Sequence, residues 1–176
     1  MRVEHDLIQP GITQPGGRWA VFSADQGAFA LALREVAGPA VEIFSIARDQ
    51  HLLEKQRRAF ATRSPGTTAH FIQGDCTQRL DLRELEGVLL ADVLHSIALD
   101  RHQGVLALLV SYLRSGGKFL FIEREKRRAS FLVPHPVDYE SFEFLAGSVG
   151  LRDLSRIAIV PTGLWSAMYT GFGVRP

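Results

Sequence analysis

The chain lacks several features that would place it in a specialised class of protein. It has 176 residues and one cysteine, Cys76, which excludes an internal disulfide and suits a reducing compartment. It contains no stretch approaching the roughly 18 apolar residues of a membrane span, and its N-terminus (MRVEHDLIQPG) is too polar for a secretory signal. The formal net charge is only +1, so bulk charge predicts neither a nucleic-acid nor a membrane partner. We therefore expect a cytoplasmic protein.

Motifs of several enzyme classes are also missing. No cluster of histidine, cysteine or carboxylate residues has metal-ligand spacing, so no metal site is expected. A Gly-x-Ser-x-Gly elbow and a Walker loop are both absent. The chain shows no internal repeat and no low-complexity linker, and 46% of its residues are hydrophobic. This composition is typical of a globular protein, and we expect residues 1–176 to form a single domain.

The pattern of apolar residues alternates between strands and helices. Strands are predicted at 18–22, 41–46, 69–72, 87–91 and 118–123, and helices at 26–37, 49–63, 100–114 and 138–149. Two last strands, at about 154–160 and 165–173, are joined by Pro161-Thr162-Gly163, a connection too short for a parallel pair. The prediction is an α/β, doubly wound, Rossmann-like sheet of seven strands, mostly parallel, with an antiparallel last strand.

Ligands of such sheets bind outside the carboxyl ends of the strands, where the strand order reverses. The residues of interest are therefore those that directly follow each strand. They fall in five segments: 23–27, 47–49, 74–76, 91–96 and 123–128.

Several segments together resemble the class I S-adenosylmethionine (SAM)-dependent methyltransferases. PGGRWAVFSADQGAFALALREVAGP resembles the first motif of that family, VEIFSIARDQHLLEKQRRAF its second strand and helix, and HFIQGDC its third strand. LEGVLLADVLHSI, LRSGGKFLFIERE and VPHPVDYESFEFLAGSVGLRDL resemble its fourth strand, fifth strand and last helix. The likeness spans nearly the whole chain. It implies the family's fold, SAM as cofactor and a small-molecule substrate.

The loop after the first strand departs from the family's first motif. Val21 stands where the family has an acidic residue, and the first two loop glycines are replaced by Ser23 and Asp25, which leaves only Gly27. Glycines allow the backbone of such a loop to approach its ligand closely. Two interpretations of Asp25 remain open: it is the N-cap of the following helix, or it is a charge that repels the cofactor's carboxylate. Either role weakens the cofactor site.

A second departure lies at the end of the second strand. Ala47 stands where the family has an acidic residue that binds the ribose hydroxyls. Losing such a charged acceptor costs about 1.5 to 3 kcal/mol. Asp49 either substitutes for this acceptor or, as the favoured interpretation, caps the next helix.

Other parts of the family's pocket are retained. The resemblance implies that Asp75 meets the adenine amino group, and that Cys76 lines the same wall or fills space as a small apolar residue. Asp92 falls where the cofactor and substrate compartments meet. The full set of implied cofactor-binding residues is Ser23, Asp25, Gly27, Ala47, Arg48, Asp75, Cys76 and Asp92.

The candidate catalytic residues are His95 and Glu123, which follow the fourth strand and end the fifth. His95 can accept a proton from a hydroxyl or amine nucleophile, or it packs beneath the next loop. Glu123 is a candidate substrate contact, and His135 and Tyr139 are expected on the substrate side. The run 124–128 binds an acidic group or, as the favoured interpretation, is a solvated loop.

Three functions are consistent with these residues. The first is a SAM-dependent methyltransferase that acts on a small molecule, with impaired or lost cofactor binding. The second is a non-catalytic binding or scaffold protein, and the third is a biosynthetic enzyme that runs a different reaction in the old pocket. Fold alone does not choose among them. With no long lid segment, we expect an open pocket unless a second subunit covers it, which leaves a homodimer as an option.

Overall fold

The computed structural model of the chain describes residues 2–125, 129–163 and 166–176. The strands are β1 (Gly17–Ser23), β2 (Val41–Ala47), β3 (Thr68–Gln73), β4 (Leu85–Ala91), β5 (Leu113–Arg124), β6 (Arg152–Gly163) and β7 (Ser166–Val174). The α-helices are α1 (Arg2–Ile8), α2 (Ala28–Ala37), α3 (Gln50–Arg63), α4 (His102–Ser111) and α5 (Tyr139–Ser148). Short 3-10 helices lie at Gln9–Gly11, Leu94–Ser96 and Leu99–Arg101.

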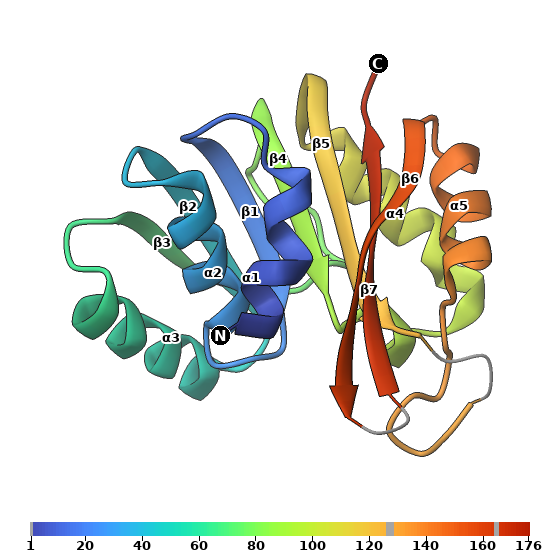
Figure 1. Cartoon of the computed structure of the whole chain (residues 1–176), viewed down its shortest axis with the longest axis horizontal. Coiled ribbons are helices and arrows are strands. Elements are labelled where there is room, and N and C mark those ends of the chain that lie inside the picture. Colours follow the sequence, from blue (N-terminus) through green and yellow to red (C-terminus); the bar gives the residue numbers. More distant parts are fainter. Residues whose placement is uncertain (1, 126–128, 164–165) are drawn as a thin grey trace.

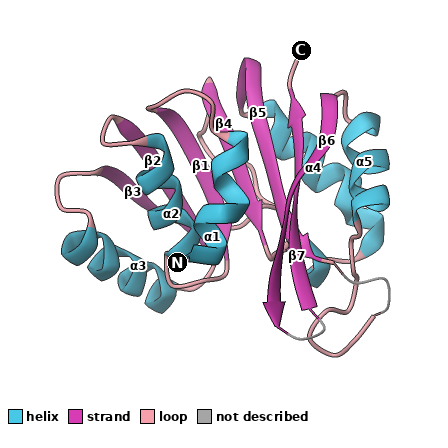
Figure 2. Cartoon of the chain, in the orientation of Figure 1, coloured by secondary structure: helices cyan, strands magenta, loops and turns pink. Residues whose placement is uncertain are grey.

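The strands form one seven-stranded sheet in the order β3-β2-β1-β4-β5-β7-β6 (Figures 1 and 2). The strands from β3 to β5 pair in parallel, whereas β7 pairs antiparallel with both β5 and β6. The last strand is therefore the antiparallel one. This confirms the predicted fold class, with its antiparallel last strand.

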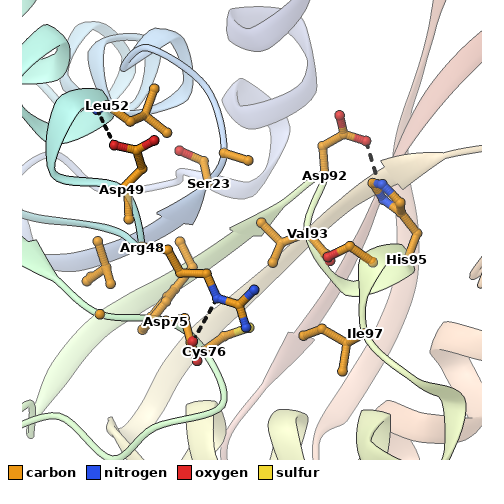
Figure 3. A pocket seen from close by; sticks show the side chains of 16 residues that line it. Ser23, Arg48, Asp49, Leu52, Asp75, Cys76, Asp92, Val93, His95 and Ile97 are labelled. Atoms are coloured by element: carbon orange, nitrogen blue, oxygen red, sulfur yellow. Dashed lines mark hydrogen bonds and ion pairs between the residues drawn. The ribbon is translucent and has the colours of Figure 1, made fainter. Parts of the chain in front are cut away.

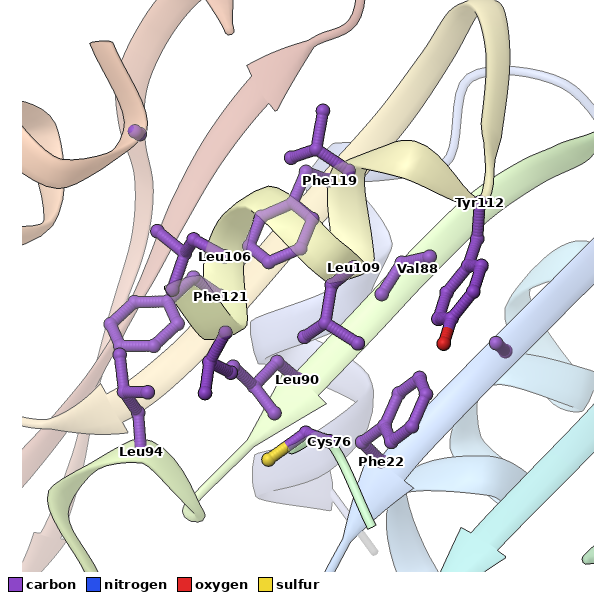
Figure 4. Close-up of a cluster of buried hydrophobic side chains, with 14 of the residues drawn as sticks. Phe22, Cys76, Val88, Leu90, Leu94, Leu106, Leu109, Tyr112, Phe119 and Phe121 are labelled. Carbon is purple, nitrogen blue, oxygen red and sulfur yellow. The ribbon is translucent and has the colours of Figure 1, made fainter. Parts of the chain in front are cut away.

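Helices cover both faces of the sheet, and alternate residues of each central strand face opposite layers. Trp19 and Val21 pack in the layer that holds α1 and α2, which Figure 1 shows in front of the sheet. Ala20 and Phe22 pack in the other layer, together with residues of α4 and α5. Figure 4 shows this second layer around Leu106 and Leu109. Burial on both faces explains why these strands are continuous apolar runs in the sequence.

Helix α4 is shorter than predicted. The helix expected over 100–114 ends at Ser111, and β5 begins at Leu113 rather than at position 118. Tyr112 is buried, its hydroxyl accepts from the backbone N–H of Leu80 at 2.8 Å, and its carbonyl accepts from the N–H of Leu85 at 3.0 Å. These contacts with distant residues end the helix, so its apolar periodicity overstated its length.

Two more expectations about the chain's ends need correction. Pro161 and Gly163 pair with Ala167 and Ser166, so the predicted turn lies inside β6. The connection falls on residues 164 and 165, which are outside the described residues. The short helix α1 was not predicted; Leu7 and Ile8 at its end are fully buried, and the Thr170 hydroxyl donates to the Leu7 carbonyl at 2.8 Å.

The strand order reverses between β1 and β4, which lie side by side at the centre of the sheet. The crevice outside the carboxyl ends of these two strands is the position at which doubly wound sheets bind ligands. No helix within the described ranges has the length and apolar character needed to cross a membrane.

Candidate functional site

A pocket of about 320 Å³ opens at this switch point (Figure 3). Its size is at the lower end of the range for small-molecule sites, about 300 to 1,000 Å³. The walls come from the residues that end or follow β1 to β4: Phe22, Ser23, Ala24, Ile46, Ala47, Arg48, Asp49, Leu52, Gly74, Asp75, Cys76, Asp92, Val93, His95, Ser96 and Ile97. Most of the lining is apolar. Of the predicted cofactor-binding residues, all but Asp25 and Gly27 line it.

Asp25 uses its carboxylate to cap helix α2. The carboxylate accepts from the backbone N–H groups of Gly27, of Ala28 at 2.7 Å and of Phe29 at 3.4 Å. Burial raises the pKa of the Asp25 carboxyl, an effect that the three N–H donors oppose. The N-cap position itself is Gly27, two residues beyond Asp25, so the predicted position of the cap was wrong, although the Asp25 carboxylate does bond to the first amides of the helix. The amides that would hold a ligand's anion are therefore bonded to the protein itself.

Ser23 lies next to this cap. Its hydroxyl is buried and makes no hydrogen bond of normal geometry to a described residue. It is nevertheless close enough to the Asp25 carboxyl to lower the pKa of that group slightly.

Gln56, which was not predicted from the sequence, also holds this loop in place. Its side chain is fully buried; the amide Nε2 donates to the Asp25 carbonyl at 2.8 Å, and Oε1 accepts from the Ser45 hydroxyl at 2.8 Å. Gly27, with a φ of 98°, packs close to Gln56. The sequence contained one signal for this role: Gln56 is a polar residue on the helix face whose other buried residues, Leu53 and Phe60, are apolar.

Replacing Gln56 with alanine is expected to lower the free energy of unfolding by about 2 kcal/mol, because the Ser45 hydroxyl and the Asp25 carbonyl each lose a buried partner. Urea denaturation of the variant measures this loss. Gln50→Ala, at the exposed start of the same helix, is the control and should change stability by no more than about 0.5 kcal/mol. Equal effects of the two substitutions would contradict a role for Gln56 in holding the loop.

The carboxylate that follows β2, that of Asp49, lines the pocket but also caps a helix. Ala47 is buried and lines the cavity. Asp49 accepts from the backbone N–H groups of His51 at 2.7 Å and Leu52 at 3.4 Å. Asp49 is therefore the N-cap of α3, as the favoured interpretation of the sequence predicted.

Arg48 and Asp75 form an ion pair at the pocket mouth, with Arg48 Nε 2.8 Å from Asp75 Oδ2 (Figure 3). The other oxygen of Asp75 accepts from the backbone N–H and the hydroxyl of Thr77. Burial raises the pKa of the Asp75 carboxyl, but the hydrogen bonds from Thr77 and Arg48 outweigh burial and leave the pKa below its usual value. The carboxylate thus stays ionised and held in place.

Cys76 has both of the roles left open by the sequence. It lines the pocket wall, and it packs as a buried residue in the layer of α4 (Figure 4). Burial raises the pKa of its thiol to about 11. The thiol therefore stays protonated near neutral pH and is a poor nucleophile.

A second polar group, formed by Asp92, His95, Glu123 and Arg124, lies on the other side of the pocket. His95 Nδ1 donates to Glu123 Oε2 at 2.9 Å, and the backbone N–H of His95 donates to Glu123 Oε1 at 3.3 Å. Arg124 donates to both oxygens of Asp92, at 2.9 and 2.8 Å. His95 and Glu123 are both buried. The two predicted catalytic residues are therefore in direct contact.

Glu123 also sets the protonation of His95. Its hydrogen bond raises the pKa of the imidazole; burial opposes this, and Asp92 adds to the increase while Arg124 reduces it. The other ring nitrogen, Nε2, makes no hydrogen bond to a described residue, and the side chain lines the cavity. A ring held through Nδ1 by a carboxylate, with Nε2 available, is the arrangement of a general base and its orienting group.

The same residues form a cluster that spacing along the sequence did not reveal. Ligand atoms of Asp92, His95 and Glu123 lie within 4.8 Å of one another. Glu123 is 28 positions beyond His95, so no local metal motif exists. Arg124 and a protonated His95 balance the two carboxylates, so the charge of the cluster is compensated by its own side chains.

The predicted substrate-side residues, His135 and Tyr139, do not line the main pocket. The backbone N–H of His135 donates to the His95 carbonyl at 3.0 Å. Tyr139 lines a separate hollow of about 110 Å³ with Glu125, Asp138, Glu140 and Arg156. In the basic run, Arg124 pairs with Asp92, while residues 126–128 are outside the described residues.

Comparisons with known proteins agree on the fold. No protein-family model matches the sequence, and no curated protein matches it. Three solved structures align closely: the mitomycin 7-O-methyltransferase MmcR (TM-score 0.75, 16% identity, 97% of this chain and 53% of that one), magnesium protoporphyrin IX methyltransferase from Synechocystis with bound SAM (0.72, 15%, 92% and 71%) and the [4+2]-cyclase SpnF (0.78, 10%, 99% and 81%).

These likenesses show the fold of class I SAM-dependent methyltransferases, as the sequence resemblance implied. The chain spans about half the length of some of the solved proteins that it matches, 50% of the methyltransferase SibL and 53% of MmcR.

Proposed function

We propose that this protein binds a small molecule in the pocket at the switch point between β1 and β4, and that it binds SAM only weakly. The observation that carries the proposal is the Asp25 carboxylate, which is bonded to the first amides of helix α2. Small-molecule methyltransferases with the same fold support a small-molecule ligand.

The residues present do not fit SAM well. The amino-acid end of SAM carries a carboxylate, and a helix N-terminus is the usual place for such a group. Here Asp25 occupies that place with a negative charge of its own. At the end of β2, Ala47 offers no acceptor for the ribose hydroxyls, and the nearby Asp49 uses Oδ1 to cap α3. We therefore derive no methyl-transfer step for this pocket.

Isothermal titration calorimetry with SAM and with S-adenosylhomocysteine tests the proposal. The expected result is a dissociation constant well above the micromolar range for both ligands, because one charged acceptor is missing and one anion site is filled. A low-micromolar constant for either ligand would contradict the proposal and make methyl transfer the leading function.

A second candidate function is proton-transfer catalysis in the same pocket. It is favoured by the His95–Glu123 pair, in which a histidine and its orienting carboxylate are in contact. The loop after β1, by contrast, departs from the family's first motif. In its neutral form, His95 would accept a proton at Nε2 from a bound hydroxyl or amine, and Glu123 would stabilise the resulting imidazolium. SpnF is a [4+2]-cyclase with this fold, so the fold itself does not require methyl transfer.

A further inference from the structure

We infer that the turn at Phe131 and Leu132 is a lipid contact, through which the protein binds the surface of an anionic bilayer without crossing it. Phe131 is 99% exposed and Leu132 is 71% exposed. Solvated turns usually carry small or polar residues instead of large apolar ones. The inference goes beyond the proposed function, because it concerns a surface outside the pocket and does not depend on which ligand the pocket binds.

Hydrogen bonds at the base of the turn hold it in this exposed conformation. The backbone N–H of Ser130 donates to the Val133 carbonyl at 2.9 Å, and the N–H of Val133 donates to the Ser130 carbonyl at 3.1 Å. The Ser130 hydroxyl also accepts from the Val133 N–H, at 3.2 Å, and the Val133 side chain is buried. Because the base is fixed on both sides, Phe131 and Leu132 are presented at the tip of the turn.

The turn lies at the same end of the molecule as the pocket. The segment 129–137 follows β5, which pairs in parallel with β4, and Figure 1 shows it at the lower edge of the molecule, where these strands end. Two residues after Val133, the backbone N–H of His135 donates to the carbonyl of His95 at 3.0 Å, and His95 lines the pocket. A bilayer bound through the turn would therefore face the end of the sheet at which the pocket opens.

The charge of the segment around the turn favours an anionic surface. Four of residues 124–137 are cationic and one is acidic, which gives the segment a formal charge of +3 with histidine neutral, whereas the whole chain has only +1. Arg124 pairs with Asp92, and Glu125 pairs with Arg156. The remaining charge is that of the run Lys126-Arg127-Arg128, which is outside the described residues and contributes here through its charge and its place in the chain. Lysine and arginine near an anionic bilayer each strengthen binding to it.

The size of the apolar surface favours a bilayer over a second copy of the chain. A phenylalanine side chain buries at most about 250 Å², and a leucine buries less, whereas a standard protein interface buries about 800 Å² on each partner. A bilayer needs no complementary surface, because single apolar side chains enter it while neighbouring cations attract its headgroups. Two apolar side chains on a turn with basic neighbours therefore suit a lipid surface better than a stable dimer.

Co-sedimentation with vesicles tests the inference. We expect the protein to bind vesicles of phosphatidylcholine and phosphatidylglycerol at least about tenfold more strongly than vesicles of phosphatidylcholine alone, and salt should weaken this binding. A double variant with Phe131→Ser and Leu132→Ser should bind the anionic vesicles at least about tenfold less strongly, because it has lost the apolar surface that enters the bilayer.

Phe144→Ser is the matched control, since Phe144 is also a large exposed apolar residue, 78% exposed, but lies on helix α5. It should leave vesicle binding unchanged, and urea denaturation of both variants checks that they are folded. Equal binding of the unaltered protein to the two kinds of vesicle, or binding to neither, would overturn the inference. Equal losses in the two variants would overturn it as well.

Sedimentation velocity without lipid separates the bilayer from a second copy of the chain. We expect the unaltered protein and the double variant to have the same oligomeric state at every concentration. A dimer that forms in the unaltered protein and is lost in the double variant would assign the turn to self-association and overturn the lipid contact. None of these measurements involves SAM, so their outcome leaves the proposed function to be judged by its own titration.

Discussion

A double variant with Asp25→Gly and Ala47→Asp should bind S-adenosylhomocysteine at least about tenfold more tightly than the unaltered protein. The first substitution frees the amides of Gly27, Ala28 and Phe29 and removes a repelling charge. The second places a carboxylate at the end of β2, where Ala47 lines the cavity. Each change should contribute roughly 1 to 3 kcal/mol, and the two should add approximately if they act independently.

Calorimetric titration of the unaltered protein, the two single variants and the double variant measures these contributions. Circular dichroism and urea denaturation of each variant check that it remains folded. Ala47→Asn supplies an uncharged acceptor at the same position and should recover less affinity than Ala47→Asp. Unchanged binding by a folded double variant would mean that the pocket has been rebuilt for another ligand.

Glu123→Gln is expected to lower the free energy of unfolding by about 3 kcal/mol near pH 6, because it breaks a buried ion pair and leaves a charged His95 in place. The pair joins His95 and Glu123 at 2.9 Å, and only 1% of Glu123 is exposed. Urea denaturation across a pH series measures the difference between variant and parent.

The sign of the pH dependence follows from the raised pKa of His95. A histidine whose folded pKa exceeds its unfolded value contributes stability that is complete below the unfolded pKa, about 6.5. That stability is lost as pH rises through the folded pKa. The gap between parent and Glu123→Gln should therefore be largest near pH 6 and should shrink in alkaline solution. In the variant, the pKa of His95 followed by NMR should fall.

Glu42→Gln is the matched control for this experiment. Glu42 accepts from His70 Nε2 at the same distance, 2.9 Å, but both side chains are partly exposed. Exposed ion pairs contribute about 0 to 1 kcal/mol, so this variant should lose at most about 1 kcal/mol. Equal losses in the free energy of unfolding for the two variants would contradict the idea that burial makes the His95–Glu123 pair the more stabilising one.

Local sequence determined the alternation of strands and helices, and with it the sheet. It also determined the two helix caps, because Asp25 and Asp49 bond to amides within four residues of themselves. Contacts this close in the chain depend mainly on residue type and backbone conformation, which a sequence pattern contains. For the same reason, the departures from the family's motifs in the loop after β1 and at the end of β2 could be predicted from the sequence alone.

Tertiary structure alone decided which of these residues meet. His95 touches Glu123 because β4 and β5 pair in a register that sets Ala91 beside Ile122. Gln56 reaches the Asp25 carbonyl across 31 positions, and Tyr112 ends α4 through contacts with Leu80 and Leu85. Such contacts depend on strand register and helix packing over the whole sheet. No window of neighbouring residues contains that information, so the sequence named the catalytic candidates but not their pairing.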